Sequence, residues 1–429
     1  MQKLKRVLRF RDVLIFGIGI IIGAGIYTII GKVAGIAGYS SWISVILAGI
    51  LSLLTGLSFA EMASIYPDTS TYYKVIRDAF KIFGGRIWGF IVQWSLILVC
   101  IFAISTVSIA FGGYFSKFIP LDETILSALI IILAGILSYL GIKESVSVTL
   151  FLTFSAIFGL ALVIMLGIFL VRPTKEIFLN VEIDKSVFYG AGLIFFAYAG
   201  FELIPAESEE TKAPKKIIPK AVVFSILICM VIYTLVCIAA LNLLDIKVLE
   251  SSNAPLFDAV SKNFGNEMGY FILFSAIFAT SSTILGLTVS GSRLLYSFGK
   301  EKLFPKIFSK ISKRKTPFVS ISLISFSSLI SMFLVRDLRV MAEISNFLTI
   351  FCFYLVNISI ILLRIYQPKI PRGFKVPFSF KNIPIPSLIA SLFCLSLLSQ
   401  FPTIIIFNCF LIILLGIIFY FIIRERYIL

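Results

Sequence analysis

The stretch Gly17-Ile18-Gly19-Ile20-Ile21-Ile22-Gly23-Ala24-Gly25-Ile26-Tyr27 decides the fold of this chain, because it places glycines in the middle of the first long apolar segment. Glycine inside a helix costs about 1 kcal/mol relative to alanine. Gly23 and Gly25 therefore predict a membrane helix that breaks and exposes backbone groups, which is tolerated at membrane depth only beside a cavity. The alternative is an unbroken helix whose small residues permit close packing against a neighbour.

The composition places the whole chain in a membrane. Of its 429 residues 59% are hydrophobic and only 14% are charged, whereas soluble domains are roughly half apolar. Apolar segments of about 20 residues recur along the chain, and the sequence predicts an all-α polytopic protein with about twelve transmembrane helices. The predicted spans are 13–36, 41–65, 87–115, 124–142, 146–171, 187–206, 219–243, 268–292, 318–335, 340–363, 384–400 and 403–423.

The net charge of +16 raises the question of a nucleic-acid partner, and the distribution of basic residues answers it. When the predicted loops are numbered alternately from a cytoplasmic N-terminus, 29 of the 38 Lys and Arg residues fall on the inner side. This asymmetry is the positive-inside rule, and it predicts that both termini are cytoplasmic. The first apolar run is too long for a signal-peptide core. No nucleic acid is expected as a partner, and the lipid bilayer is.

The cysteines and the absence of histidine limit the chemistry of the chain. All six cysteines lie in apolar spans, where they behave as small hydrophobic residues. The chain has no histidine, which is the commonest metal ligand and proton relay near neutral pH. We therefore expect no disulfide, no metal site and no cofactor, and any coupling to protons must use carboxylates or lysines.

A second irregular span follows five helices after the first. Residues 187–206 contain Gly190, Gly192 and Gly200, and Glu202 follows the last of them. Two glycine-interrupted spans at corresponding positions of two halves indicate an inverted-repeat transporter with its site at the midplane. The predicted organisation is a basic N-terminus (1–12), a first repeat (13–171), a second repeat (187–363) and a final pair of helices (384–423), all in one membrane domain.

The eighth span contains four consecutive hydroxyl residues, Thr280-Ser281-Ser282-Thr283. Hydroxyl side chains inside a membrane commonly join neighbouring helices by hydrogen bonds. The functional alternative is a site for a hard cation such as Na⁺, which prefers carbonyl and hydroxyl oxygens.

Several motifs, taken together and in order, resemble those of the amino acid, polyamine and organocation transporter superfamily. Residues 207–221, ESEETKAPKKIIPKA, resemble the family pattern E-E-x-K-N-P-x-x-x-I-P-x-A, with Ala213 in place of the preferred asparagine. Residues 23–27 resemble G-[SA]-G-[IV]-[FY], residues 59–61 resemble Y-A-E and residues 372–377 resemble R-P-F-K-V-P. Residues 292–297 and 303–305 are also similar to the family. The resemblance covers about residues 13–377.

The resemblance implies a five-plus-five inverted-repeat (LeuT-like) bundle with broken helices 1 and 6 and two added C-terminal helices, carrying an α-amino acid by alternating access. The broken first helix would bind the substrate carboxylate through backbone N–H groups, and carbonyls of both broken helices would bind its ammonium group. Phe196 corresponds to an aromatic gate position. The substrate-binding residues implied are Ile21, Gly23, Ala24, Gly25, Phe196, Ala199 and Gly200.

The coupling ion is left open by the sequence. Many proton-coupled relatives carry a lysine in the middle of the fifth helix, where this chain has Ala156. Three modes remain: substrate exchange without an ion, a proton carried by Glu202, or Na⁺ held by hydroxyls of the eighth span and carbonyls of the first. An intramembrane carboxylate is expensive and indicates function. The residues of the Na⁺ alternative are Gly19, Ile22, Thr280, Ser281 and Ser282.

The predicted function is secondary active transport of L-amino acids across the cytoplasmic membrane, by symport or antiport. Apolar neighbours of Phe196 favour a neutral, small or apolar substrate. The main alternative is a polyamine or organic-cation transporter of the same superfamily. A membrane-embedded lipid-modifying enzyme would need clustered acids, histidine or cysteine near one interface, and the sequence has no such cluster and no H-E-x-x-H or G-x-S-x-G motif. A passive channel would lack two inverted broken helices.

Overall fold

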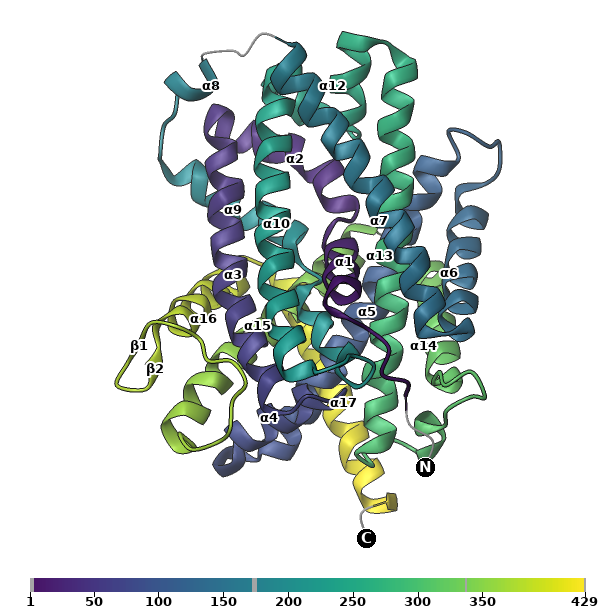
Figure 1. Cartoon of the computed structure of the whole chain (residues 1–429), viewed down its shortest axis with the longest axis vertical. Helices are drawn as coiled ribbons and strands as arrows, with labels where there is room; N and C mark the ends of the chain where they lie inside the picture. Colours follow the sequence, from purple (N-terminus) through teal and green to yellow (C-terminus); the bar gives the residue numbers. More distant parts are fainter. Residues whose placement is uncertain (1–3, 172–175, 336–337, 428–429) are drawn as a thin grey trace.

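The apolar runs form helices throughout the computed structural model, which describes residues 4–171, 176–335 and 338–427 (Figure 1). The α-helices are α1 (Phe10–Ile21), α2 (Ala24–Ala37), α3 (Ser41–Ile65), α4 (Thr71–Ala79), α5 (Gly85–Phe115), α6 (Glu123–Leu140), α7 (Ile142–Ile164), α8 (Glu176–Leu179), α9 (Lys185–Phe195), α10 (Pro214–Leu243), α11 (Ile246–Ser251), α12 (Pro255–Phe264), α13 (Asn266–Lys300), α14 (Phe318–Leu334), α15 (Leu338–Tyr366), α16 (Ile385–Leu398) and α17 (Thr403–Tyr427). A π-helical turn, η3 (Met165–Leu170), extends α7. The 3₁₀ turns are η1 (Gly38–Ser40), η2 (Lys81–Phe83), η4 (Phe196–Tyr198), η5 (Phe201–Glu209) and η6 (Lys306–Ser309).

Each predicted span coincides with one helix or with consecutive helical segments, and the span 187–206 covers three of them, α9, η4 and η5. Among the described residues, 9 helical segments are long and apolar enough to cross a membrane, and α14 and α16 are apolar but shorter. That count joins α2 and α3 into one segment and omits the 12-residue α1. The chain is thus an all-α polytopic membrane protein, while the number twelve and the inverted repeat stay predictions.

The first helix lies in the middle of the bundle (Figure 1). Helix α1 packs against α7, α10 and α13, and α9 packs against α2 and α3. All seven residues from Gly17 to Gly23 are buried. The two segments that the sequence marks as irregular are therefore surrounded by other helices, which shields their exposed backbone from lipid.

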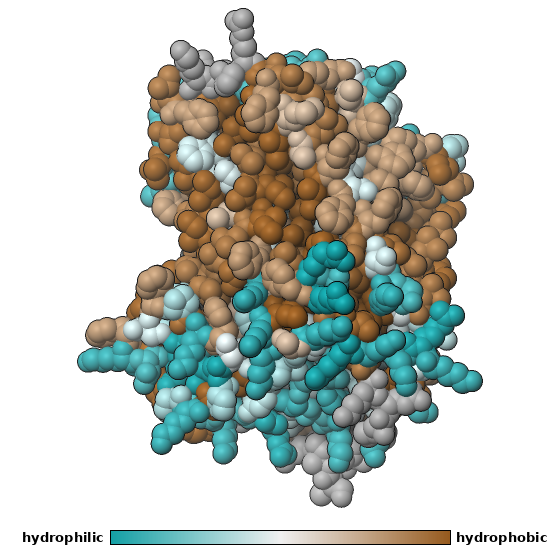
Figure 2. All heavy atoms as spheres, viewed as in Figure 1, coloured by the Kyte–Doolittle hydropathy of each residue, from teal (hydrophilic) through white to brown (hydrophobic). Residues whose placement is uncertain are grey.

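The outer surface of the bundle is apolar over most of its height, with hydrophilic residues gathered at its lower end (Figure 2). Large side chains such as Phe158 and Phe271 are 70% and 62% exposed, as suits a surface covered by lipid. We call the end that carries α4, η6 and the last turn of α13 the basic end, and both chain ends lie there (Figure 1). The opposite end, which carries α11 and α12, is called the distal end.

One small hairpin and one strained loop complete the basic end. Strands β1 (Ser379–Phe380) and β2 (Ile383–Pro384) pair antiparallel, with Phe380 opposite Ile383. The two residues between the strands have positive φ angles, as a type I′ turn requires. Ala213, at the start of α10, has φ 46° and ψ 54°. Asparagine adopts this left-handed conformation more readily than alanine does, which explains the family's preference there.

Candidate functional site

The first helix breaks where the sequence predicts. Helix α1 ends at Ile21, and α2 begins at Ala24 after an extended Gly23. A Cβ on Gly23 would lie 2.8 Å from Thr283 Oγ1, and one on Gly25 would lie 3.1 Å from the Cα of Ala197. Both positions therefore let other helices approach closely. The first N–H groups of α2 have no partners within the helix, and they face the interior at the break.

The second break lies between η4 and η5. Helix α9 ends at Phe195, and Gly200 adopts φ 123°, a conformation that side chains rarely tolerate. A Cβ on Gly200 would also lie 2.6 Å from Cγ2 and 3.1 Å from the carbonyl carbon of Ile20. The backbones of the two breaks are thus in direct contact, and Gly200 is required for both its conformation and its packing.

A tyrosine that the sequence analysis did not single out joins the two breaks. The Tyr233 hydroxyl on α10 lies 2.9 Å from the carbonyl oxygen of Ile21 and 3.1 Å from that of Ala197. The Ile21 carbonyl also accepts the Gly23 N–H at 2.8 Å. The single hydroxyl hydrogen of Tyr233 is shared between the two carbonyls, and the role of Ile21 as an acceptor for the substrate ammonium stays a prediction. In the sequence Tyr233 is the one tyrosine of a largely apolar span.

A cavity of about 720 Å³ ends at the two breaks. Its lining includes every predicted substrate-binding residue: Ile21, Gly23, Ala24, Gly25, Phe196, Ala199 and Gly200. Glu202 and Thr283 also line it, whereas the predicted ion-site residues Gly19, Ile22, Thr280, Ser281 and Ser282 do not. Five of the seven predicted residues lie at the two helix breaks or next to them: Ile21, Gly23, Ala24, Ala199 and Gly200. In the sequence, glycines indicate both breaks.

The cavity opens toward the distal end. Lys32 and Asn253 are exposed lining residues at that end, and Arg339 is a third. The walls between them and the breaks are largely apolar, with Val99, Ala103, Val107, Ala110, Ile29 and Leu287. No lining residue comes from α4, η6 or the other elements of the basic end. Access to the two breaks is therefore one-sided.

Among the described residues that line the cavity, Glu202 is the one carboxylate. It is 2% exposed, and its Oε2 accepts the Gly200 N–H at 2.6 Å. The Tyr72 hydroxyl donates to the Glu202 backbone oxygen. No ion pair to Glu202 is found in the described part of the chain. A buried carboxylate without a cation is costly unless it takes up a proton or meets a cationic ligand, and Glu202 faces a cavity that can supply either.

The hydroxyl groups of the eighth span donate to two different sets of acceptors. Thr280 and Ser281 donate to carbonyls of their own helix. Thr283 instead donates to the carbonyls of Gly19 and Ile20, at 3.2 and 3.3 Å. Thr283 is thus the hydroxyl of this group that donates to carbonyls at the end of α1, and the ion-binding role of Thr280, Ser281 and Ser282 stays a prediction.

A compact group of hydroxyls lies beside Gly19. Ser282 Oγ is 3.0 Å from Thr153 Oγ1 on α7. A Cβ on Gly19 would lie 2.1 Å from the Thr153 hydroxyl and 2.5 Å from that of Ser282. Thr149 Oγ1 is buried with no hydrogen-bond partner among the described residues. Hydroxyl oxygens of two helices, Thr153 on α7 and Ser282 on α13, therefore converge on the α1 backbone, whereas Thr149 presents its methyl carbon Cγ2 to Gly19.

The basic end is closed by a buried ion cluster. Arg293 on α13 is fully buried and donates to both carboxylate oxygens of Glu210, at 2.9 and 3.3 Å. Glu207 Oε2 lies 4.0 Å from Arg293, while Ser290 donates to its other oxygen. The N–H groups of Val7 and Leu8 donate to the Glu210 carbonyl. This cluster joins η5, α13 and the N-terminal segment beneath the second break.

A second buried ion cluster lies on the other side of the basic end. Glu61 at the end of α3 is paired with Arg364, on α15, through both oxygens. Arg372 lies 2.9 Å from Glu61 Oε1, and the Val376 N–H donates to Glu61 Oε2 at 2.7 Å. In the sequence, Glu61 and residues 372–377 belong to two separate motifs. The structure shows that they are one contact.

The comparisons with known proteins identify the family of this chain. Residues 8–425 match the model of a family described as amino acid permease. The branched-chain amino acid permease BcaP of Bacillus subtilis is 30% identical, covering 99% of this chain and 94% of the relative. The methylthioribose transporter of the same organism is 28% identical (94% and 89%), and cationic amino acid transporter 4 of Mus musculus is 26% identical (86% and 61%). The chain belongs to the amino acid permease family and is a membrane transporter of amino acids, not an enzyme.

Proposed function

We propose that this protein carries neutral, apolar L-amino acids across the cytoplasmic membrane by alternating access, and that the structure is its outward-open form. The single observation that carries the proposal is the one-sided cavity that ends at two helix breaks. A transporter must expose its site to one side at a time. The buried Arg293 cluster closes the other side.

The substrate backbone would be held by the two breaks. The N–H groups of Ala24 and Gly25 at the start of α2 suit the carboxylate, because a helix N-terminus favours an anion. The carbonyls of Phe196 and Ala199, with the Glu202 carboxylate, suit the ammonium group. Glu202 has no cationic partner among the described residues, so a substrate ammonium would compensate its charge. Alternatively, Glu202 would carry the coupling proton.

The substrate side chain would face the apolar wall. Val99, Ala103 and Phe196 line the cavity near the breaks, and Lys32 lies at its mouth. A branched aliphatic side chain gains about 1.5–3 kcal/mol when such a wall removes it from water, whereas a cationic side chain meets a second positive charge on entry. The name of the Bacillus subtilis relative, branched-chain amino acid permease, also favours an aliphatic substrate. The name of the Mus musculus relative, cationic amino acid transporter 4, favours the alternative of a cationic substrate.

The distribution of charge supports a membrane topology, and the geometry near the two breaks is compatible with more than one coupling mode. The positive-inside rule and the hydrophilic lower end of Figure 2 support cytoplasmic termini. The two breaks, one in residues 13–171 and one in residues 187–363, support the inverted repeat. Exchange without an ion needs no further site. Two ion sites fit the geometry, Glu202 for a proton, and Ser282 and Thr283 with the Gly19 carbonyl for Na⁺.

Uptake of radiolabelled leucine into proteoliposomes tests the proposal. We expect leucine uptake to be saturable. Unlabelled isoleucine should inhibit it, and arginine and spermidine should not. Competition by arginine alone would move the substrate to the cationic class, and competition by methylthioribose would move it outside the amino acids. Stimulation by an inward proton gradient that Glu202→Gln removes assigns proton coupling. Stimulation by Na⁺ that Thr283→Val removes assigns the hydroxyl site, and uptake only against trapped leucine means exchange.

A further inference from the structure

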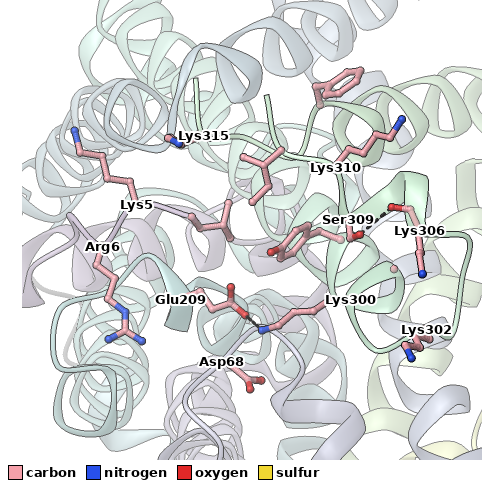
Figure 3. A pocket seen from close by; sticks show the side chains of 15 residues that line it. Lys5, Arg6, Asp68, Glu209, Lys300, Lys302, Lys306, Ser309, Lys310 and Lys315 are labelled. Carbon is pink, nitrogen blue, oxygen red and sulfur yellow. Dashed lines mark hydrogen bonds and ion pairs between the residues drawn. The ribbon is translucent and has the colours of Figure 1, made fainter. Parts of the chain in front are cut away.

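A second large cavity, of about 1320 Å³, lies at the basic end, and the transport site does not use it. It is enclosed by the N-terminal segment, the end of α13 and the loop that carries η6 to the start of α14 (Figure 3). Its lining includes Lys5, Arg6, Lys300, Lys302, Lys306, Lys310 and Lys315, together with Asp68 and Glu209.

The charges of this cavity do not balance. The lining holds seven cationic side chains and two carboxylates, and both carboxylates are already paired. Asp68 lies 2.5 Å from Lys74, and Glu209 lies 2.6 Å from Lys300. In the described chain no ion pair is formed by the other six cations of the lining, which repel one another across the cavity. A bound polyanion would remove this repulsion.

The basic residues of this cavity come from two separate chain segments that lie on opposite sides of one hollow. Figure 3 shows Lys5 and Arg6 on one side of the cavity and Lys302, Lys306 and Lys310 on the other. The positive-inside rule explains the number of cations on this face, but it does not require two separate chain segments to place theirs around one hollow. Such a hollow suits an anionic group that contacts both walls.

The rim of the cavity is partly apolar and adjoins the membrane helices. Phe318 is the first residue of α14 and is 40% exposed. Ile311 and Leu4 also belong to the lining. Free phosphate would gain nothing from these side chains. An amphiphile would place its phosphate among the lysines and its acyl chains along α14.

We propose that the cavity between the N-terminal segment and the η6 loop is a binding site for the headgroup of an anionic phospholipid. Clustered lysines and arginines on the cytoplasmic side of a membrane attract such headgroups. The lipid would connect Lys5 and Arg6 to the η6 loop. Because the neighbouring Val7 and Leu8 are bonded to Glu210, bound lipid would hold the N-terminal segment against the closed basic end.

Thermal unfolding of the purified full-length protein in detergent tests this site independently of transport. Short-chain phosphatidylglycerol, short-chain phosphatidylcholine and inorganic phosphate are titrated separately. We expect stabilisation by phosphatidylglycerol alone, with a half-saturating concentration that rises at high salt. Equal stabilisation by phosphatidylcholine would overturn recognition of charge. Equal stabilisation by inorganic phosphate would overturn the lipid assignment.

Two matched double variants locate the site. Lys306→Gln/Lys310→Gln removes two cations from the cavity, and Lys369→Gln/Lys375→Gln removes two exposed cations from the loop after α15. The first is expected to weaken phosphatidylglycerol binding by about tenfold or more, and the second to leave it unchanged. Equal losses would mean diffuse surface charge and overturn the proposal. If the first variant does not fold, Lys5→Gln/Arg6→Gln on the opposite wall must give the same loss.

Discussion

Replacement of Arg293 by glutamine should lower the free energy of unfolding of the protein, because it removes the cation of a buried ion cluster at the basic end. The guanidinium is fully buried and makes two bonds to Glu210, at 2.9 and 3.3 Å, beside the equally buried Glu207. Without Arg293, two carboxylates remain buried with no cation among their described neighbours. Removal of one partner from a buried pair typically costs about 3–5 kcal/mol. That is a large part of the roughly 5–15 kcal/mol by which a folded protein is stable.

Equilibrium unfolding in mixed detergent micelles with rising SDS measures this cost. The matched control is Lys262→Gln, which removes a cation from an exposed pair with Asp245 and should leave the midpoint unchanged, because exposed pairs add little. The triple variant Arg293→Gln/Glu207→Gln/Glu210→Gln should regain most of the loss, since no buried charge remains uncompensated.

The reasoning is refuted if Arg293→Gln loses less than about 1 kcal/mol, the size of an ordinary hydrogen bond. It is also refuted if the triple variant is no more stable than the single one. In the first case the cluster would be hydrated, and in the second the loss would come from packing rather than from charge.

Four further changes test other parts of the structure. Tyr233→Phe should cost about 1–3 kcal/mol, because the carbonyls of the two breaks lose their shared donor, and SDS unfolding measures it; an unchanged midpoint would contradict the bridge. Gly200→Ala should abolish the monodisperse peak in size-exclusion chromatography, because Gly200 has φ 123° and contacts α1. Ala213→Asn should raise the free energy of unfolding by about 1 kcal/mol, because asparagine adopts the left-handed conformation of this position more readily. Burial and the bond to Asp78 raise the pKa of Tyr66 to about 12. The neutral Tyr66 side chain stabilises the folded state fully below its unfolded pKa near 10, and this stabilisation is lost as the pH rises to about 12. Phenylalanine has no group to ionise. The fall in melting temperature between pH 9 and 11 should therefore be smaller in Tyr66→Phe than in the unchanged protein.

The four hydroxyl residues Thr280 to Thr283 illustrate what the sequence does not reveal. Four consecutive hydroxyls on one helix point in directions that differ by about 100° per residue, so only some of them can face α1. Which ones do so depends on how α13 is rotated and placed. The structure fixes this by a close contact, since a Cβ on Gly286 would lie 2.3 Å from Ile20 Cγ1. Thr283, one turn nearer to that contact than Thr280, therefore meets the end of α1.

The sequence by itself determined the membrane class, the helical segments and the two breaks of this protein. Each of these depends on local chemistry: apolar content over about 20 residues, and the conformational freedom of glycines such as Gly23 and Gly200. The tertiary structure alone decided which distant side chains meet at the breaks and close the basic end. Tyr233 lies 212 residues from Ile21, and Arg293 lies 83 residues from Glu210. Such contacts leave no periodic or local signal, because they arise only when separate helices pack together.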